Sequence, residues 1–238
     1  MGAGLLAAGV ALGAAPAQAC QLALVLALDV SSSVDAREYR FQMRGLGTAF
    51  RDPEVIEAIQ VNGGMMATAF EWSGRDKQVA VAGWTWLETD AAILAFADRL
   101  SGAPRSHSRF PTALGYALGH AATRFSRLPR PCARQVVDVS GDGVNNEGFP
   151  PASAYRAFDF TRITVNGLVI AGADPDPVAY YREDVIRGPD AFLEVASGFD
   201  DYANAMKRKL LREIRGNAFA GRDEGGEAPR ASAAIAAR

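Results

Sequence analysis

Short apolar runs alternate along the chain with longer segments that have helical periodicity. Residues 24–28 contain no polar position and stop at Asp29, which is typical of a strand buried on both faces. Residues 135–140 are expected to form a second fully buried strand. Apolar residues recur at helical spacing in residues 35–50 and 200–215. The pattern predicts an α/β fold.

The remaining segments extend this alternation. Residues 65–72 and 78–86 alternate, are rich in aromatic residues and flank a short turn, so they predict an antiparallel pair. We expect their aromatic residues to pack the strand pair rather than form an exposed patch; these are Phe70, Trp72, Trp84 and Trp86. Further expected helices are 89–100, 112–125, 152–160 and 178–186, and further expected strands are 163–170 and 191–196. The sequence therefore predicts a doubly wound, mostly parallel six-stranded sheet with helices on both faces and one antiparallel edge strand.

Both ends of the chain differ from this pattern. Residues 1–19 carry no charge and end in Ala17-Gln18-Ala19, which predicts a signal peptide cleaved near Ala19 and a secreted or periplasmic protein. The absence of a Lys or Arg before the apolar stretch departs from the signal-peptide pattern, and an uncleaved anchor or a lipid on Cys20 are the alternatives. Residues 219–238 are expected to be disordered. This leaves residues 20–218 as one domain, with no membrane span in the mature chain.

Composition excludes one class of partner. The chain has 238 residues, of which 49% are hydrophobic, and its formal net charge is −2, so it can bury the core of one soluble domain. A net charge near zero, without a basic stripe interleaved with aromatic residues, gives no support for nucleic-acid binding. The oligomeric state is not predicted.

The two cysteines occupy similar positions relative to two strands. Cys20 lies nine residues before Asp29, and Cys132 lies ten residues before Asp142. Both thiols are therefore expected at the N-terminal ends of parallel strands. If the two strands are neighbours, the thiols can form a disulfide, which would agree with an oxidising compartment. The alternative is two free thiols.

Oxygen-bearing side chains gather where strands end or helices begin. Asp29, Ser31 and Ser33 follow the first strand, Thr112 begins a helix, and Asp142 follows the second buried strand. Taken singly, Ser33 and Thr112 are more typical of helix caps than of metal ligands, and only their joint placement favours ligands. Ligands bind at the carboxyl edge of open α/β sheets, and carboxylates and hydroxyls are hard donors that suit Mg²⁺. Together these five residues predict a cation site.

This combination resembles the von Willebrand factor A domain and its metal-ion-dependent adhesion site. That site has D-x-S-x-S after the first strand, a Thr in a later loop and an Asp after the fourth strand, and all five positions are matched here. The resemblance covers residues 20–216. Four stretches also resemble a bacterial secreted group of such proteins, the DUF1194 family, which has no established activity; they are residues 27–35, 138–146, 166–168 and 209–214.

The resemblance implies how the site works. The hydroxyls of Ser31, Ser33 and Thr112 coordinate Mg²⁺, or Mn²⁺ or Ca²⁺, while Asp29 and Asp142 bind it directly or through water. The cation then takes an acidic side chain of a protein partner as its last ligand. No bond is made or broken, so the resemblance implies that the chain is not an enzyme. In that fold the first and fourth strands are adjacent, which places the two cysteines near each other.

Two other functions compete with this interpretation. The loop of residues 141–146 resembles that of haloacid-dehalogenase-type Mg²⁺-dependent phosphatases, which carry D-x-D after their first strand. Here Ser31 replaces the second Asp, which acts as acid and base in those enzymes, and Asn146 replaces another carboxylate. A structural envelope domain whose site engages no partner is the second alternative.

The loop before Thr112 and the two histidines carry weaker signals. Arg105, His107 and Arg109 could steer an acidic partner, or they belong to an ordinary solvated loop. His107 and His120 have no Cys or second His at the spacing of a zinc site, so zinc ligation by these residues is not expected.

Overall fold

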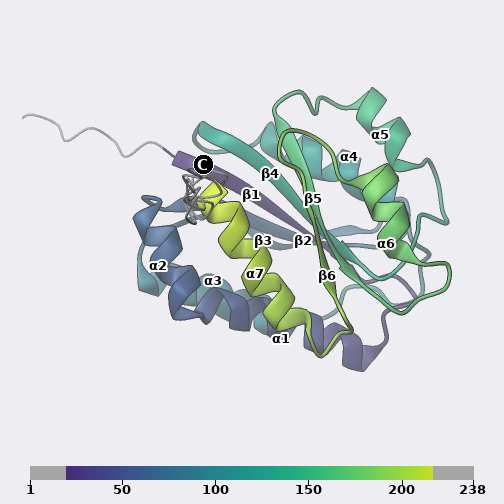
Figure 1. Ribbon diagram of the computed structural model, residues 1–238, viewed down its shortest axis with the longest axis horizontal. Coiled ribbons are helices and arrows are strands. Elements are labelled where there is room, and N and C mark those ends of the chain that lie inside the picture. The colour runs from purple at the N-terminus through teal and green to yellow at the C-terminus, as the bar shows by residue number, and fades with distance from the viewer. Residues whose placement is uncertain (1–19, 217–238) are drawn as a thin grey trace, which may run out of the picture.

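The computed structural model describes residues 20–216, and its centre is one six-stranded sheet (Figure 1). The predicted signal peptide and the predicted disordered tail of residues 219–238 lie outside the described residues. The strands are β1 (Cys20–Asp29), β2 (Met65–Trp72), β3 (Gln78–Leu87), β4 (Cys132–Gly141), β5 (Ile163–Ile170) and β6 (Leu193–Ala196). Their order is β3-β2-β1-β4-β5-β6, and only the β2–β3 pair is antiparallel. The predicted fold class is confirmed.

Helices cover both faces of the sheet. They are α1 (Ala36–Arg51), α2 (Pro53–Val61), α3 (Asp90–Ser101), α4 (Leu114–Phe125), α5 (Pro151–Ala157), α6 (Pro177–Tyr180), the π-helical turn η1 (Tyr181–Val185) and α7 (Tyr202–Arg215). Helices α1, α2, α3 and α7 lie on one face, and α4, α5 and α6 lie on the other (Figure 1). Strand β1 is buried from Leu22 to Asp29, as its unbroken apolar run predicts.

One helix differs from the sequence-based expectation, and the start of another decides the role of Ser33. Helix α2 is not among the predicted helices, although Asp52 caps its N-terminus by accepting from the amide of Glu54 and Pro53 stands in its first turn. Helix α1 begins after Asp35, whose carboxylate accepts from two amides while Glu38 bonds back to the Asp35 amide. Because this capping box is complete, Ser33 is not needed as a cap.

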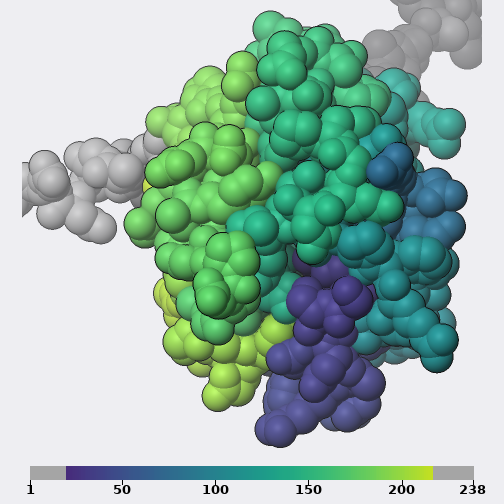
Figure 2. Space-filling model, turned by 90° about the vertical axis from the view of Figure 1, so that its right-hand side faces the viewer, coloured from purple at the N-terminus to yellow at the C-terminus, as the bar shows by residue number. Residues whose placement is uncertain are grey.

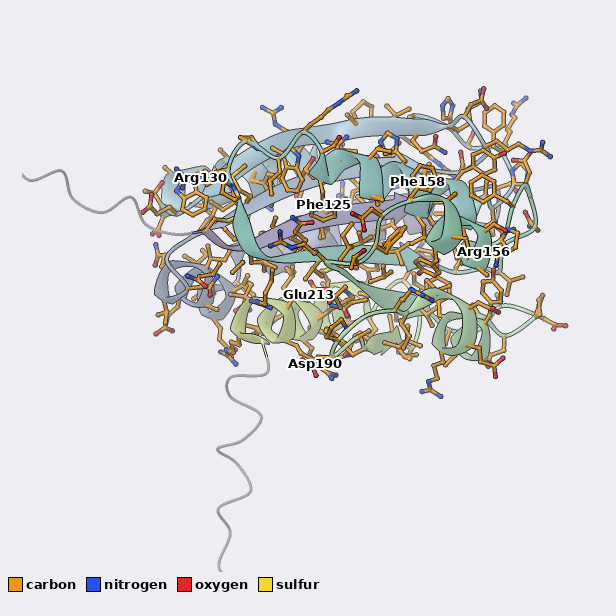
Figure 3. All side chains as sticks on the ribbon, turned by 90° about the horizontal axis from the view of Figure 1, so that it is seen from above. Phe125, Arg130, Arg156, Phe158, Asp190 and Glu213 are labelled. Carbon is orange, nitrogen blue, oxygen red and sulfur yellow. A yellow bond between two sulfur atoms is a disulfide. The ribbon has the colours of Figure 1, made fainter. Side chains whose placement is uncertain are left out.

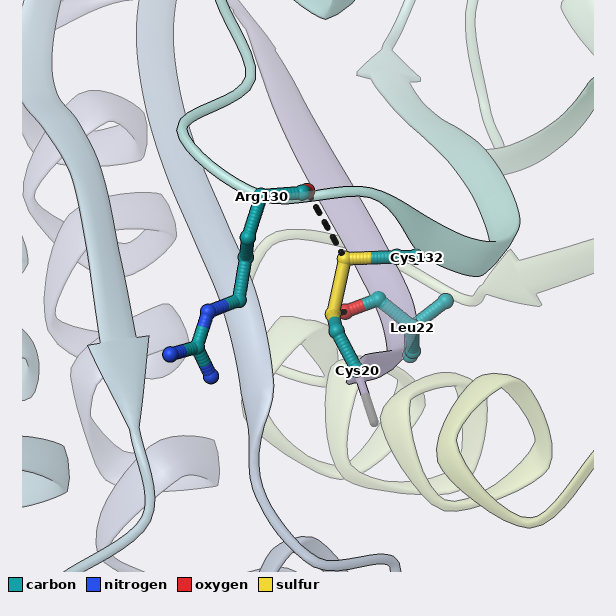
Figure 4. The surroundings of a disulfide bond; sticks show 4 residues. All are labelled: Cys20, Leu22, Arg130 and Cys132. Atoms are coloured by element: carbon teal, nitrogen blue, oxygen red, sulfur yellow. Dashed lines mark hydrogen bonds between the residues drawn. A yellow bond between two sulfur atoms is a disulfide. The ribbon is translucent and has the colours of Figure 1, made fainter. Parts of the chain in front are cut away.

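The N-terminal edge of the sheet is closed by a disulfide. Cys20 and Cys132 are register partners on the adjacent strands β1 and β4, their Cα atoms lie 4.5 Å apart, and their sulfurs are bonded (Figure 4). The Cys132 sulfur also lies 3.6 Å from the carbonyl oxygen of Arg130. The bond joins residues 112 positions apart in the chain. The predicted disulfide is present, and the alternative of two free thiols is wrong.

A buried ionic cluster joins α7 to the sheet. We call it the Lys209 cluster, and it consists of Asp138, Asn166, Lys209 and Glu213. The Lys209 ammonium lies 2.9 Å from the Asp138 carboxylate and 2.5 Å from that of Glu213. The Asn166 amide donates to Glu213 at 3.0 Å. Glu213 points from α7 toward the sheet (Figure 3), and both ends of each ion pair are buried. The cluster therefore links α7 to the sheet through ion pairs that water does not reach in the folded chain.

Candidate metal centre

The five predicted site residues meet at the carboxyl edge of the sheet, and we call them the Asp29 cluster. Asp29 ends β1, and one oxygen of its carboxylate accepts from the Ser31 amide at 2.7 Å. The Ser31 hydroxyl lies 3.1 Å from that of Ser33, which donates to Asp142 at 2.7 Å. The Thr112 hydroxyl lies 3.3 Å from that of Ser31. Contacts of hydrogen-bond length thus connect three segments that are far apart in the chain.

Figure 2 faces this edge of the molecule. The purple residues that follow β1 lie there between green segments from the second half of the chain and teal segments near its middle. Of the cluster, Asp29 and Ser31 are fully buried, Thr112 is 3% exposed and Asp142 is 8% exposed, whereas Ser33 is exposed. A ligand in solution would therefore reach the cluster from the side of Ser33 and Asp142.

Arg105 fixes the backbone of the D-x-S-x-S loop. Its guanidinium donates to the carbonyl oxygens of Val30, Ser31 and Val34 at 2.6 to 3.0 Å. The Ser32 amide also donates to a carbonyl of the loop before Thr112. The interpretation of Arg105 as a side chain that steers a partner therefore has to be revised, because its guanidinium is occupied within the chain. Arg109 of the same loop remains exposed.

Thr112 is positioned by the loop after β4. The Thr112 amide donates to the side chain of Asn146 at 2.8 Å, and its carbonyl accepts from the amides of Asn146 and Glu147. The N-cap residue of α4 is Ala113, and no side chain bonds to the cap. The helix-cap interpretation of Thr112 is therefore wrong, because its hydroxyl faces Ser31 instead. Asn146 thus has a defined role in holding the Asp29 cluster together.

The cluster contains two carboxylates and no cation from the chain. Within residues 20–216, neither Asp29 nor Asp142 forms an ion pair with a Lys, Arg or His side chain. The second oxygen of Asp29, Oδ2, is buried without a hydrogen-bond partner. Burial and the negative charge of Asp142 raise the pKa of Asp29 to about 8, and burial also raises the pKa of Asp142. An uncompensated pair of buried carboxylates is unfavourable unless a cation accompanies it.

Tyr181 and Gly141 complete the wall beside Asp29. A Cβ on Gly141 would lie 2.6 Å from the Tyr181 hydroxyl oxygen and 2.9 Å from Asp29 Oδ2, so only glycine fits there. The Tyr181 hydroxyl is buried without a hydrogen-bond partner, and burial together with the nearby Asp29 and Asp142 carboxylates raises the pKa of Tyr181 well above its usual value. The proton therefore stays on Tyr181, and this phenol adds no negative charge to the cluster.

The donor set suits a hard divalent cation. It offers two carboxylates and three hydroxyls, all oxygen donors of the kind that Mg²⁺ prefers. Within the described part of the chain, no group of three or more His, Cys, Asp and Glu side chains could hold a metal, so binding at this edge would depend on the hydroxyls as much as on the carboxylates. The unpartnered Oδ2 of Asp29 shows that the residues present fit such an ion.

The other residues noted in the sequence lie against aromatic side chains. The His107 ring is 5.1 Å from that of Phe110, and the His120 ring is 4.6 Å from that of Phe70. Burial lowers the pKa of His120. Phe70 and Trp72 are fully buried, in agreement with the predicted packing, whereas Trp84 and Trp86 are only partly buried.

Sequence reasoning did not identify Arg105, Asn146, Gly141 and Tyr181 as residues that shape the site. The only signal for Arg105 is its place in the loop before Thr112, and Gly141 and Asn146 lie in a loop whose glycine and asparagine content was visible. Tyr181 had no such signal, because it lies 39 positions beyond Asp142 and reaches the cluster only through the fold.

Comparison with solved structures supports the fold. Proximal thread matrix protein 1 from the mussel byssus is 18% identical with a TM-score of 0.60, over 82% of this chain and 49% of that one. A von Willebrand factor type A protein from Catenulispora acidiphila is 17% identical with a TM-score of 0.61, over 82% of this chain and 43% of that one. BatB from Bacteroides thetaiotaomicron is 14% identical with a TM-score of 0.59, over 82% and 100%. The chain thus spans about half the length of the mussel protein.

One further structure of the mussel protein is described as having a zinc-occupied MIDAS motif, that is, a metal-ion-dependent adhesion site; it is 19% identical with a TM-score of 0.59, over 82% of this chain and 48% of that one. No curated protein matches the chain. The model of the DUF1194 family, described as a protein of unknown function, matches residues 19–218. The chain therefore belongs to the DUF1194 family and has the fold of a von Willebrand factor type A domain.

Proposed function

We propose that this chain is a binding protein that holds a divalent cation, most simply Mg²⁺, in the Asp29 cluster and uses it to bind an acidic side chain of a protein partner. The observation that carries the proposal is the buried, unpartnered Oδ2 of Asp29 beside a second carboxylate and three hydroxyls. The mussel neighbour with a zinc-occupied motif of the same name supports it by analogy.

Each residue of the cluster has a distinct role in this proposal. Ser31, Ser33 and Thr112 would contribute neutral oxygens, and Asp29 and Asp142 would contribute the charge that attracts the cation. When bound, the cation supplies an electrophilic contact point for a carboxylate of the partner. Ser33 and Asp142 lie on the side of the cluster that solvent reaches, so the partner would approach there.

The proposal includes no catalysis. The residue two positions after Asp29 is Ser31, whose hydroxyl contacts two other hydroxyls and cannot act as an acid and base at neutral pH as a carboxylic acid does. Phosphatases that use D-x-D need a carboxylic acid at this position. We therefore propose binding rather than phosphoryl transfer, and the expected activity on a phosphate ester such as p-nitrophenyl phosphate is none.

We also propose a secreted or periplasmic location. The disulfide between β1 and β4 supports it, because structural disulfides persist in oxidising compartments. Across residues 20–216, no helix is both long enough and apolar enough to cross a bilayer.

The first test measures cation binding directly. Isothermal titration calorimetry with Mg²⁺ and Mn²⁺ should give saturable binding with one ion per chain, and Asp142→Asn should weaken it at least about tenfold because a charged ligand is lost. Asp76→Asn, which changes an exposed carboxylate paired only with Lys77, is the matched control and should bind normally. Equal affinity in the wild type and Asp142→Asn would contradict the cation site.

The second test concerns the partner. Proteins captured in Mg²⁺ by the immobilised wild type should be released by EDTA and should not be captured by Asp142→Asn. If the ion binds but capture is insensitive to EDTA, the chain is a structural domain with an occupied site, and the binding function is wrong.

A further inference from the structure

A groove opens directly beside the Asp29 cluster. It has a volume of about 590 Å³, within the usual range of ligand-binding clefts, and Ser33 and Asp142 are among the residues that line it. Its walls come from the start of α1, from the loop after β5 and from the loop between β6 and α7. A partner side chain at Ser33 and Asp142 would therefore place its neighbouring residues in this groove.

The groove has an apolar floor. Ile170 at the end of β5 is buried, and Phe199 is half-buried against the core. Phe41 on α1 is 39% exposed, although most of the large apolar side chains of the described chain are buried. The Arg37 guanidinium lies 5.3 Å above the Phe41 ring, so this cation rests on an aromatic face.

The rim of the groove is acidic. Apart from Asp142, which belongs to the Asp29 cluster, three carboxylates line it and only one cation, Arg37, does so; the carboxylates are those of Asp35, Glu38 and Asp200. The loop on the other side of the cluster, residues 102–111, carries the exposed Arg109 and the partly buried His107. The surface around the cluster is therefore charged unevenly, and the groove side is the negative side.

We infer that the partner binds as a peptide segment in which the carboxylate that reaches the cation lies within about three residues of a Lys or Arg, and that this basic side chain occupies the acidic groove. The inference rests on the proposed function. An acidic rim next to a bound cation attracts a segment with one charge of each sign and disfavours a purely acidic segment. The apolar floor would accept the methylene stem of the basic side chain.

Selection from a phage-displayed random peptide library tests this. The full chain is immobilised in Mg²⁺, bound phage are eluted with EDTA, and the eluted peptides are sequenced. We expect Asp or Glu in nearly all of the eluted peptides. Lys or Arg within about three positions of that residue should be enriched about fivefold over the unselected library, which is the change in affinity that one exposed ion pair gives.

A double variant isolates the groove. In Glu38→Gln/Asp200→Asn, the carboxamide introduced at position 38 can still accept from the Asp35 amide, so the cap of α1 is kept while two charges are lost. The enrichment of Lys and Arg should fall to background while that of Asp and Glu stays. Glu57→Lys, on exposed residue 57 of α2, is the control and should leave both enrichments unchanged.

The outcomes separate this inference from the proposed function. EDTA-eluted peptides that carry Asp or Glu without a nearby Lys or Arg would overturn the groove inference and leave the cation-binding function standing. If EDTA elutes no enriched peptides, although calorimetry shows that Mg²⁺ binds, both the partner-binding function and the groove inference are wrong.

Discussion

Two buried acidic clusters use residues on or just after β4, and they differ in one component. In the Lys209 cluster, the carboxylates of Asp138 and Glu213 both contact the Lys209 ammonium. In the Asp29 cluster, the carboxylates of Asp29 and Asp142 contact only hydroxyls and an amide. The chain supplies a cation to one pair of carboxylates and none to the other.

The difference follows from what each cluster has to do. A carboxylate removed from water needs a counter-charge, and a lysine on a packed helix is a permanent one. The Lys209 cluster therefore joins α7 to the sheet and leaves no position for a ligand. In the Asp29 cluster the Arg105 guanidinium is nearby but turned toward three carbonyl oxygens, so the position of the counter-charge stays available to an ion from solution.

The largest expected effect comes from removing the internal cation. Lys209→Met keeps the length of the side chain but leaves two buried carboxylates unpaired, so the free energy of unfolding should fall by about 3–5 kcal/mol. Urea denaturation followed by circular dichroism measures it. Lys207→Met, whose ammonium pairs with two carboxylates at the surface, is the control and should cost less than about 1 kcal/mol. Equal losses in the two variants would show that burial of the Lys209 cluster has no energetic consequence.

Adding the external cation should have the next largest effect. Mg²⁺ at about one hundred times its dissociation constant should stabilise the wild type by about 2.7 kcal/mol, because it binds only the folded chain. Asp29→Asn should lose this stabilisation, and in EDTA it should be at least as stable as the wild type, since burial and Asp142 already disfavour the ionised form of this carboxylate, whose Oδ2 has no partner. Thermal denaturation with and without Mg²⁺ measures both. A wild type that is insensitive to Mg²⁺ would mean that the two clusters do not differ in their need for an outside cation.

The sequence could predict the Asp29 cluster because its parts follow local rules. Asp29 and Asp142 each come at the end of a buried strand, and parallel strands bring their carboxyl ends to one edge. Once the resemblance to the von Willebrand factor A domain placed the first and fourth strands side by side, Ser31 and Ser33 were expected close to Asp142. The disulfide followed from the same topology, at the opposite ends of the same two strands.

The Lys209 cluster could not be predicted in the same way. Lys209 is one of several charged residues in a strongly amphipathic helix, and Asp138 interrupts an apolar strand without a local partner. Their contact depends on how α7 rotates and slides against the sheet, which side-chain packing decides and helical periodicity does not. The same reason hid Tyr181, because its hydroxyl reaches Asp29 only through the position of the turn that follows α6.

The Lys209 cluster should also make stability depend on pH. The pKa of Asp138 is raised to about 7, mainly by burial. The Lys209 ammonium acts against this rise, and the Glu213 carboxylate adds to it. Tyr202 and Tyr181 are the other titratable side chains whose charge couples to Asp138. The folded chain therefore holds a proton that the unfolded chain loses near pH 4, so this contribution to stability is complete at lower pH and is lost as the pH rises through about 7.

The difference in stability between the wild type and Asp138→Asn isolates this contribution. Relative to the variant, the wild type should lose up to about 1.4 kcal/mol per pH unit between about pH 4 and about pH 7. Urea denaturation across this range measures the slope, and Asp184→Asn at an exposed position is the control. A difference that stays constant with pH would show that Asp138 remains ionised throughout, fully compensated by Lys209.

The smallest expected effect tests whether neutral oxygens matter in the Asp29 cluster. Thr112→Val keeps the shape of the side chain but removes the hydroxyl that lies 3.3 Å from that of Ser31. One neutral donor should contribute about 1 kcal/mol to cation binding, so Mg²⁺ affinity should fall about fivefold, less than for either Asp variant. Calorimetry measures it, with Thr85→Val on β3 as the control. An unchanged affinity in Thr112→Val would mean that the Thr112 hydroxyl does not contribute to holding the ion, and the proposed ligand set would lose the oxygen that comes from the start of α4.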